Sequence, residues 1–416
     1  MTVIAVFYLL VIYSNIPFLN NLRSLYIQTA MSTINHKWLA TAIVPSDMID
    51  DVMRLEYENR ESMVGVESEW GNFSVEELPS LSEMEKTGTA EQEPAPQKTT
   101  APADTQVDET EDDPMAEIFS SPEAELFFEV FWELDRESVE NYIREHPTVL
   151  YNGWAGIDIN ESSLDAKGTD MYTIHGDQVL ALNAVDGITL IRVYLSSNRS
   201  RGVMAICKDT SRLKLCVAST LGTTGQTAGR ICDNNGGILA ITGSAFMDDG
   251  YANGGQISGL AVCSGVIYGE RLSNYEVGAK RLELRSDNKM YIVDSTSELG
   301  AGTRDACEFH PALIVDGTVY HDDWWSDMNP RAVLGQTNKL ETIMVVVEGR
   351  LASSLGCSTG AVADKMAEYG CVQALNLDGG TSAMMYYKGE FINLCSNPAL
   401  PGGRTLPTAW VYMPSR

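Results

Sequence analysis

Residues 372–393 constrain the fold of this 416-residue chain most strongly, because they combine a buried strand, a polar loop and a hairpin. The apolar residues up to Leu377 predict the strand. The loop 378–382 (DGGTS) follows at once, and a hairpin with Lys388-Gly389 at its turn comes next. Glycines let backbone N–H groups approach a ligand oxygen closely. This loop is therefore either a ligand-binding loop or a tight turn in which Asp378 bonds its own backbone.

The acidic composition limits the partners of the chain. Its formal net charge at pH 7 is −28, from 57 Asp and Glu against 29 Lys and Arg. A chain of this charge is not expected to bind a nucleic-acid backbone. Recognition of a phosphate group must then depend on a few individually positioned arginines and not on a broad basic surface.

The eight cysteines all lie between Cys207 and Cys395, with no CxxC pair and no Cys/His grouping at zinc spacing. An even number fits disulfides in an oxidising compartment and fits buried free thiols equally well. Cys207 and Cys216 flank a predicted hairpin, so this pair is the expected bridge if one forms.

Residues 1–22 are predicted to be an N-terminal signal anchor. The run 2–13 is almost wholly apolar and extends to near Leu22, and a membrane span needs about 20 residues. A cleaved signal peptide and a buried helix are the alternatives, although no basic segment precedes the run. This prediction attaches the chain to a membrane and places the remainder outside the cytoplasm.

Four segments are predicted to follow the anchor. Residues 23–77 form a helical juxtamembrane segment, and residues 78–122 form a disordered acidic linker because they bury too little apolar surface to fold. Residues 123–170 are a helical lead-in that begins with one helix over 123–146. Residues 171–416 alternate short strands with glycine turns and scattered helices. This pattern predicts an α+β domain with mixed or antiparallel sheets.

Further polar segments are candidates to join the loop 378–382. The segment 242–246 follows an apolar strand and leads to Asp248 and Asp249, which are either functional carboxylates or solvated loop residues. Arg331 begins a predicted strand, and Arg404 follows two glycines. Two arginines beside glycine-rich loops are able to clamp a phosphate, although an arginine at a strand end is also commonly a solvated charge.

Taken in order, these motifs resemble the phosphodiester glycosidase family. The segment 377–382 with Gly403-Arg404 and Pro407 is similar to its C-terminal signature, and 330–335 is similar to its internal arginine motif. The segment 242–246 is similar to its Asn-Gly-Phe loop, and the resemblance covers about 171–413. The anchor and spacer resemble those of membrane-tethered bacterial members. The sequence departs from the family pattern at three positions, which leaves the substrate open: Thr242, His310 and Thr381.

The resemblance implies hydrolysis of a sugar-1-phosphodiester with release of the sugar, on cell-envelope or exopolysaccharide glycans. Asp378 is then the expected catalytic carboxylate, with Asp248 or Asp249 as the second. The expected contacts to sugar or phosphate are Arg331, Arg404, Gly379, Gly380, Thr381, Ser382 and Gly243. A divalent cation, Ca²⁺ or Mg²⁺, is an option that no dense ligand cluster demands. Two alternatives stay open: a non-catalytic module that binds phosphorylated glycans, and a phosphodiesterase that leaves a sugar phosphate.

Overall fold

A computed structural model describes the chain in nine ranges: 2–31, 37–71, 74–76, 78–87, 115–196, 199–247, 253–269, 277–320 and 328–415. The candidate carboxylates Asp248 and Asp249 lie outside these ranges. The predicted linker 78–122 is described at its two ends, where α5 and α6 form, whereas residues 88–114 lie outside the described residues.

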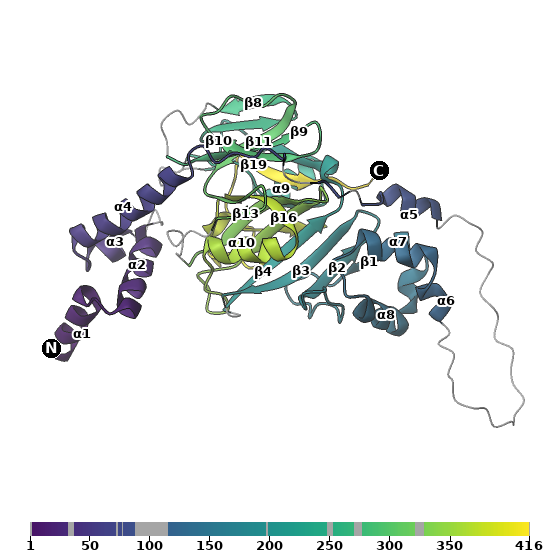
Figure 1. Ribbon diagram of the computed structural model, residues 1–416, viewed down its shortest axis with the longest axis horizontal. Helices are drawn as coiled ribbons and strands as arrows, with labels where there is room; N and C mark the ends of the chain where they lie inside the picture. Colours follow the sequence, from purple (N-terminus) through teal and green to yellow (C-terminus); the bar gives the residue numbers. More distant parts are fainter. Residues whose placement is uncertain are drawn as a thin grey trace, which may run out of the picture.

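The described residues form three antiparallel sheets, which make up the body of the molecule (Figure 1). The largest has nine strands in the order β1 (Asp158–Asn160), β2 (Gln178–Asn183), β3 (Ile188–Leu195), β4 (Ser200–Cys207), β15 (Thr342–Val347), β14 (Arg331–Thr337), β16 (Cys371–Leu377), β12 (Ala312–Val315), β13 (Thr318–Val319). One five-stranded sheet has the order β10 (Met290–Asp294), β9 (Lys280–Arg285), β11 (Thr303–Phe309), β7 (Leu260–Cys263), β8 (Val266–Gly269). The other has the order β18 (Glu390–Phe391), β17 (Tyr386–Tyr387), β6 (Leu239–Thr242), β19 (Thr408–Tyr412), β5 (Leu213–Val217).

Helices lie at both ends of this body and against its sheets (Figure 1). At one end are α1 (Thr2–Tyr13), α2 (Pro17–Met31), α3 (Lys37–Thr41) and α4 (Ser46–Ser62). At the other are α5 (Leu81–Thr87), α6 (Ala116–Phe119), α7 (Pro122–Val130) and α8 (Arg136–Glu145). The helices α9 (Ala228–Asn234) and α10 (Thr359–Glu368) pack on the sheets, and short 3₁₀ turns cover Pro147–Leu150, Trp154–Gly156, Thr210–Arg212 and Gly380–Ser382. The predicted α+β class is confirmed.

None of the helices among the described residues combines the length and the apolar character that a membrane crossing requires. The apolar N-terminal run is divided between α1 and α2, with Ser14, Asn15 and Ile16 between them.

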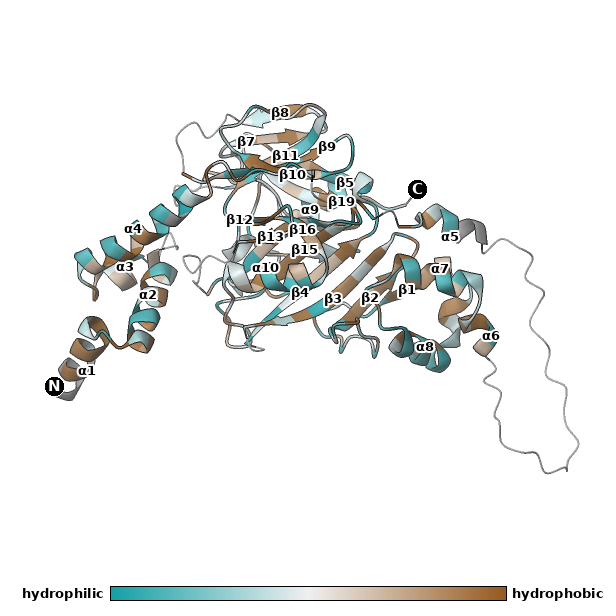
Figure 2. Ribbon diagram, in the orientation of Figure 1, coloured by the Kyte–Doolittle hydropathy of each residue, from teal (hydrophilic) through white to brown (hydrophobic). Residues whose placement is uncertain are grey.

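The nine-stranded sheet buries both of its faces. Leu190, Leu334 and Leu375 on one face share a core with the two smaller sheets, whereas the other face packs against α10 through Val362 and Met366. Hydrophobic residues accordingly run along the strands (Figure 2). Because both faces are covered, polar side chains of this sheet reach solvent mainly where strands end.

Residues 63–70 pack onto the sheets although they lie far upstream in the sequence. Met63 is 2% exposed and belongs to the main core. The Ser68 amide donates to the carbonyl of Ile292 at 2.8 Å, and the Trp70 indole N–H donates to the carbonyl of Met290 at 2.8 Å. The main core therefore extends to this segment, and experiments on the domain should use the whole chain.

The prediction of one helix over 123–146 is wrong, because the chain breaks between α7 and α8. Asp135 ends the break as the N-cap of α8, since its carboxylate accepts from the Ser138 amide at 2.8 Å. Within the break, Glu133 is fully buried and accepts from the Thr189 hydroxyl at 2.6 Å. A partner 56 residues away thus overrides the helical pattern.

The predicted Cys207–Cys216 bridge is also wrong. All eight cysteines fall in described ranges, and all are buried free thiols. Cys207 lies on β4 of the nine-stranded sheet, whereas Cys216 lies on β5 of a different sheet, opposite Ala409. Burial raises the pKa of the Cys207 thiol well above its ordinary value, so this thiol stays protonated.

Candidate functional site

The register of two central strands brings Arg331 and Asp378 together. Strands β14 and β16 are antiparallel, with Ala332 opposite Leu377. When this register is extended by one step, Asp378, just after the end of β16, is level with Arg331, and cross-strand neighbours share a face of a sheet. Arg331 is only 5% exposed, and its Nε donates to the carbonyl of Cys357 at 3.0 Å. A guanidinium and a carboxylate are therefore held at the same strand ends, and Asp378 is half-buried.

The two glycines after Asp378 let the loop rest directly on the chain before Arg331. A Cβ added to Gly379 would stand 2.3 Å from the carbonyl oxygen of Pro330, so no other residue fits without a shift. The Gly380 amide donates to that same oxygen at 3.2 Å. Gly380 also has a φ of +57°, a conformation that favours glycine.

Ser382 orients the Asp378 carboxylate. Its hydroxyl donates to Asp378 Oδ2, and its side chain is almost fully buried. Because a buried donor has few other orientations available, this hydrogen bond fixes the direction of the carboxylate.

Arg404 belongs to the same cluster of loops. Its amide donates to the carbonyl of Thr381 at 3.2 Å, and a Cβ on Gly403 would lie 3.0 Å from that oxygen. The guanidinium carbon of Arg404 lies 4.4 Å from the centroid of the Phe246 ring, within the range of a cation–π contact. The segment of Arg404 therefore adjoins both the loop after Asp378 and Phe246.

Gly243 directly follows β6 and packs against Thr408 of β19, the strand that follows Arg404. Strand β6 pairs with β19, with Thr242 opposite Ala409. A Cβ on Gly243 would stand 2.3 Å from the Thr408 hydroxyl oxygen, and the Ser244 amide donates to that oxygen at 2.7 Å. Close backbone packing accounts for glycine at this position, and its predicted contact with a ligand stays a prediction.

Arg350 was not among the residues that the sequence singled out. It is exposed and follows β15 at the sheet end where Arg331 begins β14. Its Nε and Nη2 donate to Asn329 Oδ1 at 3.2 and 2.7 Å. A Cβ on Gly380 would lie 3.5 Å from Arg350 Nη1. The pairing of β14 with β15 is the signal that places Arg350 here, since the segment after β15 emerges beside Arg331, which begins β14.

Asn376 is a second residue that the sequence did not single out. It precedes Asp378 by two positions and so faces the same side of the sheet. Its Nδ2 donates to the carbonyl of His310 at 2.8 Å, and its Oδ1 is buried and lacks a hydrogen-bond partner among the described residues. An acceptor is thus available near Asp378.

Ser358 stands in a G-x-S-x-G spacing over residues 356–360. Its hydroxyl oxygen accepts from the Ala361 amide at 3.2 Å and caps the N-terminus of α10. This role as a helix cap accounts for the serine.

Across the ranges that the structure describes, no three His, Cys, Asp or Glu side chains gather as a metal-binding group. Asp378 and Asn376 offer oxygen atoms of the type that Ca²⁺ and Mg²⁺ prefer. The suggested divalent cation therefore stays a prediction.

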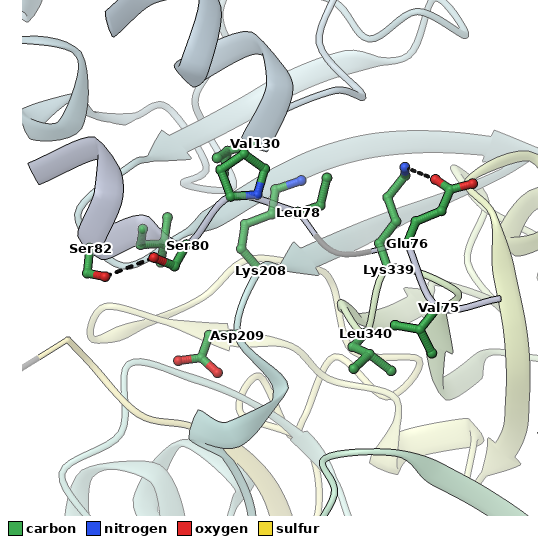
Figure 3. A pocket seen from close by; sticks show the side chains of 12 residues that line it. Val75, Glu76, Leu78, Ser80, Ser82, Val130, Lys208, Asp209, Lys339 and Leu340 are labelled. Carbon is green, nitrogen blue, oxygen red and sulfur yellow. Dashed lines mark hydrogen bonds and ion pairs between the residues drawn. The ribbon is translucent and has the colours of Figure 1, made fainter. Parts of the chain in front are cut away.

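A hollow of about 460 Å³ lies elsewhere, near the junction of β4 with the β14–β15 turn (Figure 3). Its lining consists of Val75, Glu76, Leu78, Pro79, Ser80, Leu81, Ser82, Val130, Lys208, Asp209, Lys339 and Leu340. Since β14 begins at Arg331 and ends at Thr337, this hollow is at the opposite end of the strands from Arg331.

The cationic groups of this hollow are neutralised. Lys208 Nζ donates to Glu133 at 2.6 Å and to Glu341 at 2.7 Å, and all three side chains are at most 3% exposed. Burial would lower the pKa of Lys208, but the two carboxylates outweigh it and raise that pKa above its ordinary value. Lys339 pairs with Glu76. The hollow therefore does not offer a site for an anion.

A comparison with known protein families finds a match over the part of the chain that contains the loops around Asp378. Residues 235–413 match the family model for phosphodiester glycosidases. We refer to residues 235–413 below as the phosphodiester glycosidase domain, after the family that they resemble. The match includes Asp378, Arg331 and Arg404.

Individual relatives of the phosphodiester glycosidase domain are distant. The SPbeta prophage-derived uncharacterized protein YomE of Bacillus subtilis is 26% identical over 191 residues, which make up 43% of this chain and 29% of that protein. The match thus spans less than a third of that relative's length.

Solved structures are similar to this chain at low identity, and three of them are described here. The zebrafish N-acetylglucosamine-1-phosphodiester alpha-N-acetylglucosaminidase catalytic domain, auto-inhibited by its pro-peptide, has a TM-score of 0.45 at 15% identity, covering 55% of this chain and 82% of its own. A hypothetical protein from Synechocystis has a TM-score of 0.39 at 14% identity, covering 56% and 63%. A putative exported protein from Burkholderia pseudomallei has a TM-score of 0.37 at 13% identity, covering 52% and 74%.

The phosphodiester glycosidase domain shares its largest sheet with residues outside the matched range. Strands β1 to β4 precede residue 235, and β4 pairs with β15 over the full length of β15. Strand β4 therefore supports β15, which precedes Arg350 and pairs with β14.

Proposed function

We propose that the chain hydrolyses a sugar-1-phosphodiester and releases the sugar and a phosphate monoester. One observation carries the proposal: the loop after β16 contacts both the start of β14, through Gly380 and Pro330, and the segment before β19, through Thr381 and Arg404. All three segments lie within the phosphodiester glycosidase domain.

In this proposal Arg331 and Arg404 hold the phosphate. A guanidinium group presents N–H donors in a plane that matches two phosphate oxygens. The buried position of Arg331 supports this role, because a charge contact is stronger where water is largely excluded. The amides of the loop 379–382 and the Thr381 hydroxyl complete the contacts to sugar or phosphate oxygens.

Asp378 performs the chemical step. The bond between the anomeric carbon and the phosphate oxygen breaks, and its electron pair leaves with the phosphate. The oxygen of a water molecule then bonds to the anomeric carbon, and the water loses a proton. The Asp378 carboxylate either stabilises the positive charge that develops on the sugar or accepts the proton of the water. Ser382 fixes the direction of that carboxylate through its hydrogen bond.

Phosphorylated glycans of the cell envelope or of an exopolysaccharide are the proposed substrates, and the proposed location is outside the cytoplasm at a membrane. The supporting features are the apolar run 2–13 and the acidic composition, which leaves phosphate recognition to individual arginines.

The test is to assay the whole chain on a panel of chromogenic sugar-1-phosphodiesters, as wild type and as Asp378→Asn. We expect Asp378→Asn to lower kcat by about 10²–10⁴-fold, because a carboxylate in an acid–base or charge-stabilising role contributes on this scale. Asp165→Asn is the matched control, because Asp165 is an exposed loop carboxylate. Both variants should unfold at the wild-type temperature. An active Asp378→Asn variant would remove Asp378 from the mechanism.

The alternative function is a module that binds phosphorylated glycans without cutting them. The same panel separates the two functions. If wild-type protein binds the sugar-1-phosphodiesters and none is hydrolysed, the chain is a binding module and the enzymatic proposal is wrong.

A further inference from the structure

Arg350 lies on the loop that joins β15 to α10, beside the loop that follows Asp378. Its Nη1 is 3.5 Å from the position that a Gly380 Cβ would occupy. It therefore faces the same backbone segment whose other side rests on Pro330, before Arg331. The two arginines thus approach the loop 378–382 from the start of β14 and from the loop after β15.

Asn329 sets the plane of the Arg350 guanidinium. Asn329 Oδ1 accepts from both Nε and Nη2, at 3.2 and 2.7 Å. Asn329 is itself 5% exposed, and its amide and carbonyl form a bridge with Cys357, at 3.4 and 3.0 Å. Since Cys357 also accepts from Arg331 Nε, one buried backbone segment positions both arginines.

The loop that carries Arg350 is packed too tightly to change shape easily. A Cβ on Gly349 would stand 2.7 Å from Pro330 N, and one on Gly356 would stand 2.6 Å from the carbonyl carbon of Asn329. Arg350 itself has a φ of +58°, which is uncommon for a residue other than glycine. Such a conformation persists only where the surrounding packing imposes it, and it is found at ligand-binding sites.

Arg201, in the same part of the fold, shows what a structural arginine looks like. Its Nε and Nη2 donate to Glu348 at 3.0–3.1 Å, and Glu348 is 3% exposed. This ion pair anchors the chain just before Arg350. Arg350 differs from Arg201 in that it is exposed and donates to Asn329 Oδ1.

We propose that Arg350 is a phosphate-binding residue, which contacts the substrate phosphate from the Gly380 side while Arg331 contacts it from the Pro330 side. This inference rests on the proposed function and adds a third guanidinium to it. Its role is to bind the phosphate, and no proton transfer is assigned to it.

The test measures the affinity of the whole chain for inorganic phosphate by titration calorimetry, and kcat and KM on a hydrolysed sugar-1-phosphodiester. We expect Arg350→Gln to weaken phosphate binding about 10- to 100-fold, the range for losing a hydrogen bond to a charged group. KM should rise more than kcat falls. Arg350→Lys keeps the charge and should bind phosphate with intermediate affinity.

Arg54→Gln is the matched control, because Arg54 is an exposed arginine on α4 whose ion pairs lie on the surface. Phosphate affinity of Arg350→Gln within twofold of wild type would overturn the inference, whether or not Asp378→Asn is inactive. If wild-type protein hydrolyses none of the substrates but Arg350→Gln still loses phosphate affinity, the proposed function fails and the anion site stands.

Discussion

The two ends of the nine-stranded sheet both carry buried charged side chains, but the groups that hold those side chains differ. At one end, Lys208 is enclosed between Glu133 and Glu341, so the charges compensate one another. At the other end, the buried Arg331 donates to a backbone carbonyl and the exposed Arg350 donates to an amide side chain, beside glycines that bring backbone close. The buried Glu348 at this end pairs with Arg201. The comparison teaches that buried charge alone does not mark a functional site. Arginines that lie beside a glycine-rich loop are the better indicator.

The largest effect on stability should come from removing the buried cation at the end where Lys208 lies between Glu133 and Glu341. Lys208→Met would leave two buried carboxylates without their cation, and removing one partner of a buried ion pair costs about 3–5 kcal/mol of stability. Denaturant unfolding measures this change. Activity per folded molecule should stay at the wild-type level.

Lys214→Met is the control for this variant, since Lys214 is exposed on β5 and its replacement should change stability by no more than about 0.5 kcal/mol. If Lys208→Met retained its stability but lost activity, the division between a structural end and a functional end would be wrong.

At the other end of the sheet, Gly379→Ala is expected to lower catalytic activity, and this effect is smaller in free-energy terms than the loss of stability in Lys208→Met. The new Cβ would stand 2.3 Å from the Pro330 oxygen, so the loop must move away from Arg331. A displacement of about 1 Å at a reacting group lowers activity about 10²-fold, and kcat/KM on a sugar-1-phosphodiester measures it. Gly71→Ala is the control, because a Cβ there meets no atom within 4 Å. Equal activity of the two variants would show that the position of this loop does not matter.

The smallest effect should come from replacing the whole compensated cluster in the triple variant Glu133→Gln, Lys208→Met, Glu341→Gln. Replacing a buried ion cluster as a unit is often neutral or stabilising. The pKa of Lys208 is raised above its ordinary 10.5, so its stabilising charge is present at lower pH and is lost as pH rises past that raised value.

The difference in unfolding free energy between wild type and the triple variant should therefore be constant from about pH 6 to 9. A wild-type advantage that disappears by pH 9 would mean that burial lowers the pKa of Lys208, contrary to the expected direction.

The sequence predicted those parts of the site that depend on local pattern. An apolar strand followed by Asp378 and two glycines is recognisable without a structure, and so is an arginine at the start of β14. Arg350 was missed because its position depends on which strands pair, and that choice is made by the packing of whole sheet faces.

Partners distant in the sequence account for the wrong predictions. The helix over 123–146 breaks because Glu133 bonds Lys208, which is 75 residues away. Cys207 and Cys216 flank a turn in the sequence, but the chain changes sheets between them. Neither the register of a sheet nor a change of sheet leaves a local pattern in the sequence.

The most direct test of the central claim is hydrolysis of a sugar-1-phosphodiester by the whole chain in ¹⁸O-labelled water, with both products analysed by mass spectrometry. Cleavage between the anomeric carbon and the phosphate oxygen, with Asp378 acting at the sugar, predicts the label in the released sugar and none in the phosphate monoester. Label in the phosphate product would contradict the account, because water would then have attacked phosphorus and the chain would be a phosphodiesterase that leaves the glycosidic oxygen on the sugar.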